Sequence, residues 1–394
     1  MIGIGRQPYK MSVSGKCVTL FAVVSAALIA AVQLGRAQSK GVETIYKVLA
    51  PLTQDNLTVF PIVTSMTRDT RNFLTLDEGL RSGQVVITEE GGSAGLVRPR
   101  PHVIPNPDFP IPGPRSGAEV NRLVLSNNSD RPLILLAGEI VTGGKQDRVV
   151  GKDRIIPPKG EPVDLSVFCV EPHRWVEMSE RFGGFNVAMA QPSVRFNAMA
   201  KKDQQGVWDQ VARSRASVAA ALPAPAAHAL GETSSYAVAF QNGEVRQKVD
   251  EVATPIEHSY EKLISQLRAE HAVGSVVAIN SEIVWVDAFA STGLFDKYWP
   301  KLIRSYAAEA VTLRLNSNKP AAAPSIKEAQ LFLDDFDGQH EKVESEPRVY
   351  RNTEIVGRDF DAFILRSLLP GTDFNVHTAK MRSDKAFYGY KPIY

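Results

Sequence analysis

The segment 132–137 constrains the fold of this chain most, because every residue in it after Pro132 is apolar. Alternate side chains of a strand point to opposite faces, so apolar residues line both faces of this segment. Such a strand is typical of the interior of a sheet. The turn-forming residues 127–130 precede it, and residues 120–125 have a strand pattern. We therefore predict a β-hairpin over 120–137.

Strand and helix patterns alternate along the rest of the chain. Residues 148–156 and 163–170 continue the strand pattern, and 275–286 predicts a second hairpin. Apolar residues recur at helical spacing over 204–222 and 295–312, and Thr254-Pro255-Ile256-Glu257 is typical of a helix start. The predicted fold class is α+β, with a mixed, mainly antiparallel sheet, flanking helices and a small C-terminal extension.

Residues 1–37 have the three parts of a secretory signal peptide. Basic residues precede an apolar run from Cys17 to Ala31, and small residues precede Gln38. This pattern predicts cleavage after Ala37 and export to the periplasm or the medium, with no stable membrane insertion of the cleaved chain. The alternative is an uncleaved N-terminal membrane anchor, because the run is only slightly short of the ~20 residues of a spanning helix.

Proline-rich segments divide the remaining chain. We predict a main α+β domain over 38–317 that carries a proline-rich loop at 98–114, where helix and central strand are both disfavoured. A linker follows at 318–324. Residues 325–394 are predicted to form a small C-terminal α/β extension that begins with a capped helix at Ser325.

Charge and cysteine content exclude some classes of function. The sequence has 45 Lys and Arg against 43 Asp and Glu, and the leader holds four basic residues and no acid, so the mature net charge is −2. A near-neutral surface with mixed signs argues against a nucleic-acid partner. Cys169 is the one cysteine left after cleavage, and it shares a strand face with apolar residues. This position favours packing over a reactive thiol.

A polar patch follows the apolar strand and comprises Gly138–Arg148 and Cys169–Trp175. Strand parity places Glu139 on the face of Leu135, and it places Glu171 on the face of Val167. Both carboxylates thus continue core faces where the strands end.

Carboxylates that lie half-buried beside cations can bind anionic or polyol ligands, or one of them can act as a general base. We assign catalytic roles to Glu139 and Glu171. The ligand-binding candidates of the same patch are Lys145, Gln146, Asp147, Arg148 and Arg174. The alternative is an ion-pair network that braces the fold.

The sequence identifies no cofactor and no metal site. The histidines are scattered singly, which argues against zinc, while Mg²⁺ or Ca²⁺ at Glu139, Asp147 and Glu171 stays open. Residues 138–146 are similar to a phosphate-binding P-loop, but the lysine is one place late and Gln146 replaces Ser or Thr.

Several motifs together carry a family resemblance. They are Ala137–Ile140, Gly143–Arg148, Asp153, Pro157-Pro158, Cys169–Trp175, Arg195, Gln204-Gln205, Trp208, Trp285 and Ser305-Tyr306. Over roughly 43–315 the chain resembles the ARG-and-rhodanese-phosphatase-superfamily-associated protein domain. The proline-rich loop and the region after Pro324 look like additions.

The resemblance implies no established activity. The family name implies, by gene association, a link to ADP-ribose or related nucleotide chemistry. Carried over residue by residue, it supports the patch residues above and adds Arg195 as a ligand-binding candidate.

Our leading hypothesis is an exported protein whose polar pocket binds an anionic, sugar-phosphate or ADP-ribose-like ligand and could hydrolyse it. The alternative is a non-catalytic, envelope-associated binding or structural module. The sequence points to no particular protein partner.

Overall fold

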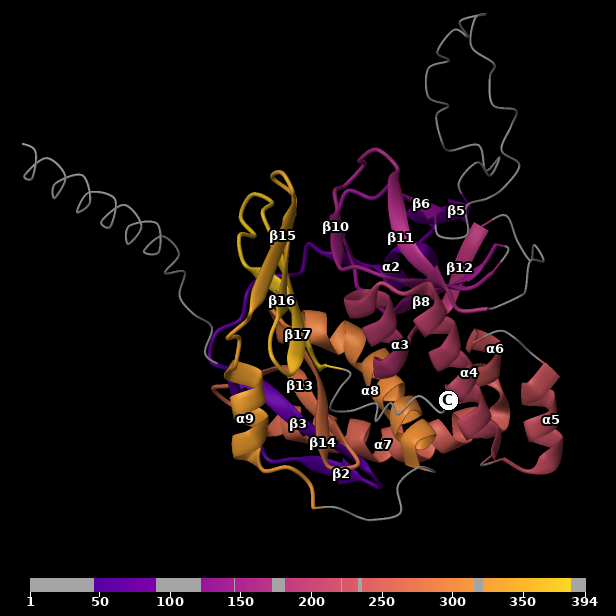
Figure 1. Cartoon of the computed structure of the whole chain (residues 1–394). Helices are drawn as coiled ribbons and strands as arrows, with labels where there is room; N and C mark the ends of the chain where they lie inside the picture. Colours follow the sequence, from indigo (N-terminus) through magenta and orange to yellow (C-terminus); the bar gives the residue numbers. More distant parts are fainter. Residues whose placement is uncertain are drawn as a thin grey trace, which may run out of the picture. The chain divides into compact units, whose positions relative to one another are not determined.

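Two β structures, an open sheet and a closed barrel, organise the chain (Figure 1). The computed structural model describes residues 46–89, 122–144, 146–171, 181–220, 222–232, 236–314 and 322–383. Strand pairing is almost entirely antiparallel and helices flank the strands, which confirms the predicted α+β class. The predicted signal peptide and the proline-rich loop lie outside the described residues.

The large sheet has nine strands in the order β1-β3-β13-β14-β18-β17-β16-β15, and β2 also pairs with β3. The bounds of its strands are β1 Tyr46–Val48, β2 Leu52–Gln54, β3 Leu57–Thr64, β13 His271–Ile279, β14 Glu282–Phe289, β15 His340–Glu346, β16 Tyr350–Val356, β17 Phe360–Ser367 and β18 Asn375–Arg382. The predicted hairpin at 275–286 is confirmed as β13–β14.

The segment after the linker belongs to this same sheet. Strand β18 pairs with β14 from Trp285↔Met381 to Phe289↔His377, so the C-terminal strands extend the sheet begun by β1 and β3. Residues 325–394 are predicted as a small extension, but the strands within them share one hydrogen-bonded sheet with the main domain. The sequences of β15–β17 are charged and weakly patterned, so they did not indicate that these strands continue the large sheet.

The barrel closes in the order β11-β6-β5-β12-β8-β9. A separate small sheet has the order β10-β7-β4, and its strands alternate along the sequence with strands of the barrel. The barrel strands are β5 Val85–Glu89, β6 Arg122–Asn127, β8 Glu139–Gly143, β9 Arg148–Val150, β11 Val163–Cys169 and β12 Arg181–Met189. The small sheet consists of β4 Leu74–Thr75, β7 Leu133–Leu135 and β10 Arg154–Ile156.

The predicted hairpin over 120–137 is wrong. Strand β6 pairs with β5 and β11, whereas β7 pairs with β10 and β4. Asn127 explains the change of direction: its amide donates to the Arg131 carbonyl at 2.9 Å and the Ile156 carbonyl at 3.2 Å, and its side-chain oxygen accepts from Ser129 N at 3.1 Å. The turn thus leads from one sheet to another. Strand β7 is nevertheless central and buried, as predicted.

The helices are α2 Leu76–Arg81, α3 Pro192–Phe196, the π-helix η1 Asn197–Lys201, α4 Gln204–Ala220, α5 Ala224–Glu232, α6 Tyr236–Gln241, α7 Gly243–Gln266, α8 Thr292–Arg314 and α9 Ile326–Asp334. The predicted start at Thr254 is wrong, because α7 begins after the Asn242 cap and contains Pro255. A continuous apolar stripe from Val245 to Tyr260 is buried along α7, and this packing carries the helix through the proline.

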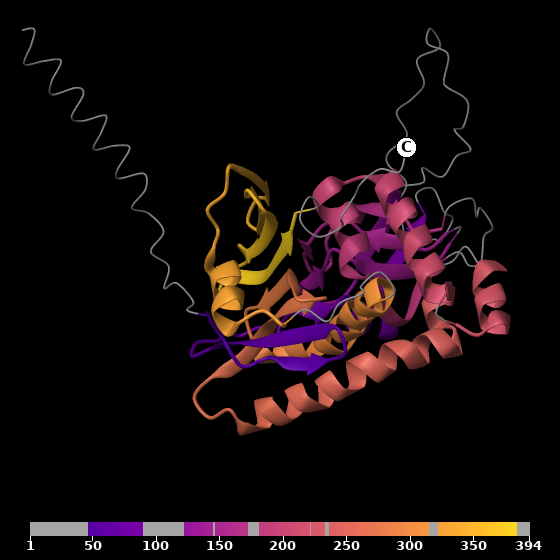
Figure 2. The ribbon, with the colours of Figure 1, turned by 60° about the horizontal axis from the view of Figure 1, so that its bottom comes forward.

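Helices α7 and α8 pack against each other, and α8 also contacts β13, β14 and β12. Figure 2 shows α7 as the long helix along one side of the molecule. The opposite face of the sheet packs on α9 through Ala329 and Leu333. Helix α8 therefore contacts both the sheet and the barrel. None of the helices in the described ranges is long and apolar enough to span a membrane.

Candidate functional site

Glu139, at the start of β8, is bound through both carboxylate oxygens. Oε2 accepts from the Leu136 N–H at 2.8 Å, and Oε1 lies 2.6 Å from Lys301 Nζ of α8. Lys301 also lies 2.6 Å from Asp77 Oδ2 of α2. Burial raises the pKa of the fully buried Glu139 despite the Lys301 charge. For Lys301, burial acts to lower the pKa, but the two carboxylates outweigh it and the pKa is raised.

Glu171 lies just beyond the end of β11, among other residues of the predicted patch. Its Oε2 accepts from the Asp147 N–H at 2.7 Å, and its carbonyl accepts from Gln146 Nε2 at 3.0 Å. The Cys169 thiol donates to Gln146 Oε1 at 2.8 Å, and burial raises the pKa of this thiol. The prediction that Cys169 is packed is confirmed.

Arg148, the first residue of β9, is fully buried, and its Nη2 lies 3.7 Å from Glu89 Oε1. Glu89 ends β5, so the two charges come from different strands of the barrel. Lys145 and Arg174, the other predicted cations, lie outside the described residues.

The two predicted catalytic carboxylates are offset along the barrel strands and have separate partners. Strand β9 pairs antiparallel with β8 on one side and with β11 on the other, so β8 and β11 run parallel. Glu139 starts β8 and Glu171 follows the end of β11. Ile140 and Phe168 both pair with Val149, so Glu139 lies one residue before this level and Glu171 lies three residues beyond it. Each carboxylate has its own set of partners.

Arg195 of α3 has a different carboxylate partner from Arg148. Its guanidinium makes a bidentate contact with Asp287 of β14, at 2.9 and 3.0 Å, and lies 4.3 Å from the centre of the Trp285 ring. Its side chain packs on Gly138, where a Cβ would come within 2.5 Å of it. The φ of +96° at Gly138 also favours glycine, so this residue admits the arginine and turns the chain into β8.

Asp287 and Asp153 hold His377 of β18 between them. His377 Nδ1 lies 2.6 Å from Asp153 Oδ2, and Nε2 lies 3.1 Å from Asp287 Oδ1. Burial acts to lower the pKa of His377, but Asp153 and Asp287 raise it to about 9. The Tyr306 hydroxyl donates to Asp287. Burial raises the pKa of Asp287, but Arg195 and His377 outweigh burial and lower it. All five groups are fully buried.

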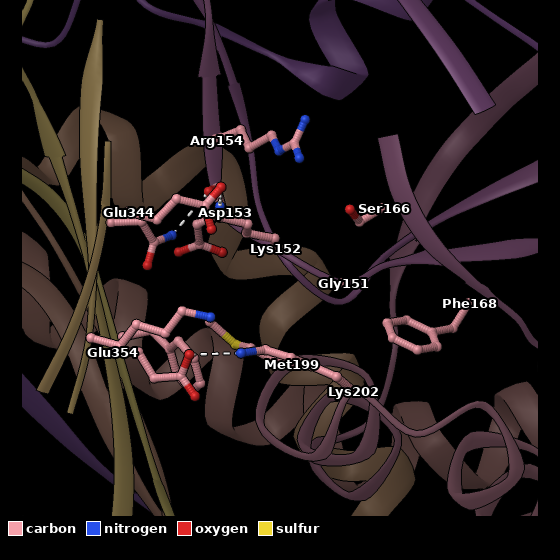
Figure 3. Close-up of a pocket in the computed structure, with 13 residues that line it drawn as sticks. Gly151, Lys152, Asp153, Arg154, Ser166, Phe168, Met199, Lys202, Glu344 and Glu354 are labelled. Atoms are coloured by element: carbon pink, nitrogen blue, oxygen red, sulfur yellow. Dashed lines mark hydrogen bonds and ion pairs between the residues drawn. The ribbon is translucent and has the colours of Figure 1, made fainter. Parts of the chain in front are cut away.

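A pocket with a volume of about 310 Å³ opens beside Asp153, between the barrel and the C-terminal strands (Figure 3). We call it the junction pocket. It is lined by Gly151, Lys152, Asp153, Arg154, Ser166, Phe168, Met199, Lys202, Lys342, Glu344, Asn352, Glu354 and Phe363. Figure 3 shows Glu344 and Glu354 on the strands of one side and Lys152, Lys202 and Phe168 on the other.

Two ion pairs cross the junction pocket. Lys152 contacts Glu344, and Lys202 Nζ lies 2.6 Å from Glu354 Oε2. Burial lowers the pKa of Lys152, and Glu344 opposes this effect. Among the described residues, Arg154 and Lys342 have no carboxylate within 4.0 Å, although Arg154 donates to the Asp164 carbonyl at 2.9 Å. The pocket therefore has more positive than negative side chains available to a ligand.

Sequence reasoning missed Lys301, Asp287 and His377. The one signal for Asp287 is a charge inside an otherwise apolar strand, 283–289. Lys301 adjoins apolar residues of α8 in the sequence, and no neighbouring residue marks it as part of a site. No cluster of three or more metal-ligating side chains occurs within the described ranges.

The fold and sites define a class: an α+β protein with a closed barrel, a nine-stranded antiparallel sheet and a charged pocket at their junction. The chain matches the model of the ARG and Rhodanese-Phosphatase-superfamily-associated Protein domain over residues 45–379, and it belongs to this family. The match passes the linker, so the family domain includes most of the C-terminal strands. No curated protein and no solved structure matches the chain.

Proposed function

We propose that this protein binds a small anionic molecule of sugar-phosphate size in the junction pocket. The observation that carries the proposal is the pair Arg154 and Lys342, two cations that line the pocket and have no carboxylate within 4.0 Å among the described residues, although both act on Glu344 at longer range. Guanidinium and ammonium groups are the usual protein partners of phosphate oxygens. We therefore retain the hypothesis of an anionic ligand, but we propose that the ligand binds in the junction pocket rather than at the polar patch.

The size of the pocket supports a small ligand. Ligand pockets in proteins span about 300–1,000 Å³, and 310 Å³ is at the lower limit. A sugar phosphate suits this volume better than a complete ADP-ribose. Phe168 and Phe363 add apolar walls against which a sugar ring can pack.

The charges of the pocket also favour an anion. Four cationic side chains line it, and two of them face Glu344 and Glu354. The third carboxylate, Asp153, is neutralised by His377, whose raised pKa keeps it protonated at neutral pH. A phosphate would also compete with the two glutamates for Lys152 and Lys202.

We propose binding without hydrolysis. A general base needs a carboxylate that can accept a proton from substrate or water. Each carboxylate of the pocket already has a partner: Asp153 has the Ala137 N–H and His377, Glu344 has Lys152, and Glu354 has Lys202. We propose that Glu139 and Glu171, the predicted catalytic residues, brace the fold through their contacts with Lys301, Leu136 N–H and Asp147 N–H. This supports the alternative reading of the patch as a structural network.

Thermal unfolding with ribose 5-phosphate, inorganic phosphate and ribose tests the proposal. We expect ribose 5-phosphate to raise Tm by a few degrees, phosphate to raise it less, and ribose to leave it unchanged. Lys342→Gln and Arg154→Gln should each weaken the shift. Lys262→Gln, which changes an exposed lysine on α7, is the matched control.

Two results would argue against the proposal. If no anion shifts Tm, or if the pocket variants respond like Lys262→Gln, the junction pocket is not the binding site. Release of phosphate from ribose 5-phosphate by the wild type, lost in Lys342→Gln, would instead support a hydrolase.

We also propose that the chain is exported, on the basis of the leader pattern of residues 1–37. Mass spectrometry of the protein recovered from its native compartment should find Gln38 at the N-terminus. A membrane-bound chain that retains residues 17–31 would favour the anchor.

A further inference from the structure

Strand β15 ends the large sheet. Within the described residues it pairs only with β16, so its other edge presents unpaired backbone N–H and C=O groups (Figure 1). All seven residues of β15 are exposed, and Val343 at its centre is 51% exposed. An exposed edge of this kind can be extended by another strand.

We propose that a second copy of this chain pairs with the edge of β15, antiparallel and with Val343 of the two copies opposite each other. The occupant follows from the sequence of the strand, His340-Glu341-Lys342-Val343-Glu344-Ser345-Glu346. In this register Lys342 faces Glu344 of the partner subunit, and Glu344 faces Lys342 of the partner subunit. His340 faces Glu346 of the partner subunit. The strand is therefore complementary to itself.

Every nearby register is worse. A shift by one residue in either direction places Glu341 opposite a glutamate of the other copy, Glu344 or Glu346. A shift by two places Lys342 opposite Lys342 of the partner subunit, or Glu344 opposite Glu344 of the partner subunit. Like charges directly opposite each other destabilise strand pairs, whereas opposite charges stabilise them. The charge pattern thus selects one register and also favours a second copy over an unrelated strand.

The two faces of the pairing have different roles. Residues 340, 342, 344 and 346 share one face because alternate side chains point the same way. Lys342 and Glu344 on this face line the junction pocket. The other face carries Val343, so pairing brings two exposed valines together. The sheets of the two copies would join, and the two junction pockets would lie near the shared edge.

Charge substitutions at positions 342 and 344 provide the test. Lys342→Glu gives a strand with acidic residues at both positions, and Glu344→Lys gives one with lysines at both. Each variant alone should dimerise more weakly in sedimentation equilibrium, with the dimer dissociation constant raised roughly tenfold or more. An equimolar mixture of the two should form a heterodimer, because each acidic position then faces a lysine.

The double variant Lys342→Glu/Glu344→Lys restores complementarity and should dimerise like the wild type. Lys327→Glu, on the exposed surface of α9, is the control that should stay dimeric. Circular dichroism checks that each variant is folded, and no ligand is added, so the result is independent of the proposed binding function.

Three outcomes would overturn the proposal. The wild type could remain a monomer up to about 100 μM, which excludes all but very weak pairing. The single variants could dimerise with the dissociation constant of the wild type, which would place the interface elsewhere. The mixture of the two single variants could remain monomeric, which would exclude this register.

Discussion

Lys301 and His377 are single residues that each offset the negative charge of two buried carboxylates. Each cation lies between two carboxylates that come from other parts of the chain: Asp77 and Glu139 for Lys301, Asp153 and Asp287 for His377. Burying a charge costs several kcal/mol unless a partner offsets the lost hydration. Removing a central cation therefore takes away a charge that offsets the burial of two carboxylates.

Lys301→Met should lower the free energy of unfolding at pH 7 by about 3–5 kcal/mol, as expected for a broken buried ion pair. The loss should be smaller in acid, because Glu139, whose pKa burial raises, can then take up a proton. Urea unfolding at pH 5 and pH 7 measures both effects. The matched control on the same helix is Lys297→Met, whose half-exposed pair with Glu78 contributes only about 0–1 kcal/mol. Equal losses in the two variants would contradict the prediction.

His377 should make stability depend on pH in the alkaline range. Its pKa is raised from 6.5 to about 9 in the folded state, so its stabilising effect is complete below pH 6.5 and is lost as pH rises through 9. The wild type should lose at most about 3 kcal/mol in this range. His377→Gln should be less stable at pH 6.5 and should show a flatter profile up to pH 9.5. Parallel profiles for the two proteins would rule out this role.

At the scale of elements, α8 carries a buried polar stripe within its apolar surface. Lys301, Ser305 and Glu309 follow one another at intervals of four residues and therefore share a face. Ser305 donates to the Ala190 carbonyl at 2.6 Å, and Glu309 accepts from Ser193 N at 2.9 Å and Ser193 Oγ at 2.7 Å. Through these contacts α8 holds the segment that joins the barrel to α3.

Glu309 should also make stability fall as pH rises, but between pH 4.5 and 7 rather than in the alkaline range of His377. Burial raises the pKa of this carboxyl from 4.5 to about 7, although the Ser193 N–H and hydroxyl favour its charged form. A carboxyl with a raised folded-state pKa reduces stability progressively as pH rises from 4.5 to 7. Relative to wild type, Glu309→Gln should thus gain up to about 3 kcal/mol between pH 4.5 and pH 8. Chemical denaturation at these two pH values measures the gain, and a constant difference would contradict it.

The type of most elements could be predicted from local sequence, but their partners could not. The β13–β14 hairpin, α8 and the Ser325 capping box are set by patterns within a few residues, and all three are present. The predicted 120–137 hairpin is wrong because turn residues indicate that the chain reverses but not which strand pairs next. The same limit applies to the patch: parity placed Glu139 and Glu171 in the core correctly, yet the barrel topology that separates them is a long-range property.

At the scale of the whole molecule, the junction pocket and the His377 contacts both depend on the C-terminal strands β15–β18. Strand β18 supplies His377, and β15–β17 supply one wall of the pocket. Asp153 comes from the loop between β9 and β10, more than half the chain earlier. Taken alone, the sequence of residues 325–394 indicates only a small charged segment and does not show which strand it pairs with. The proposed site therefore could not be located before the sheet was known.

Truncation after Pro324 tests whether the sheet is one cooperative unit. The deletion removes the strand that pairs with β14 from Trp285 to Phe289 and leaves Asp287 without His377. We expect the shortened chain to lack a cooperative unfolding transition and near-ultraviolet circular dichroism. The control keeps every residue: a protease site inserted at 322–324 and cleaved after folding should leave the two fragments associated through β14 and β18. If the truncated chain unfolds cooperatively with native-like spectra, residues 325–394 are a dispensable extension after all.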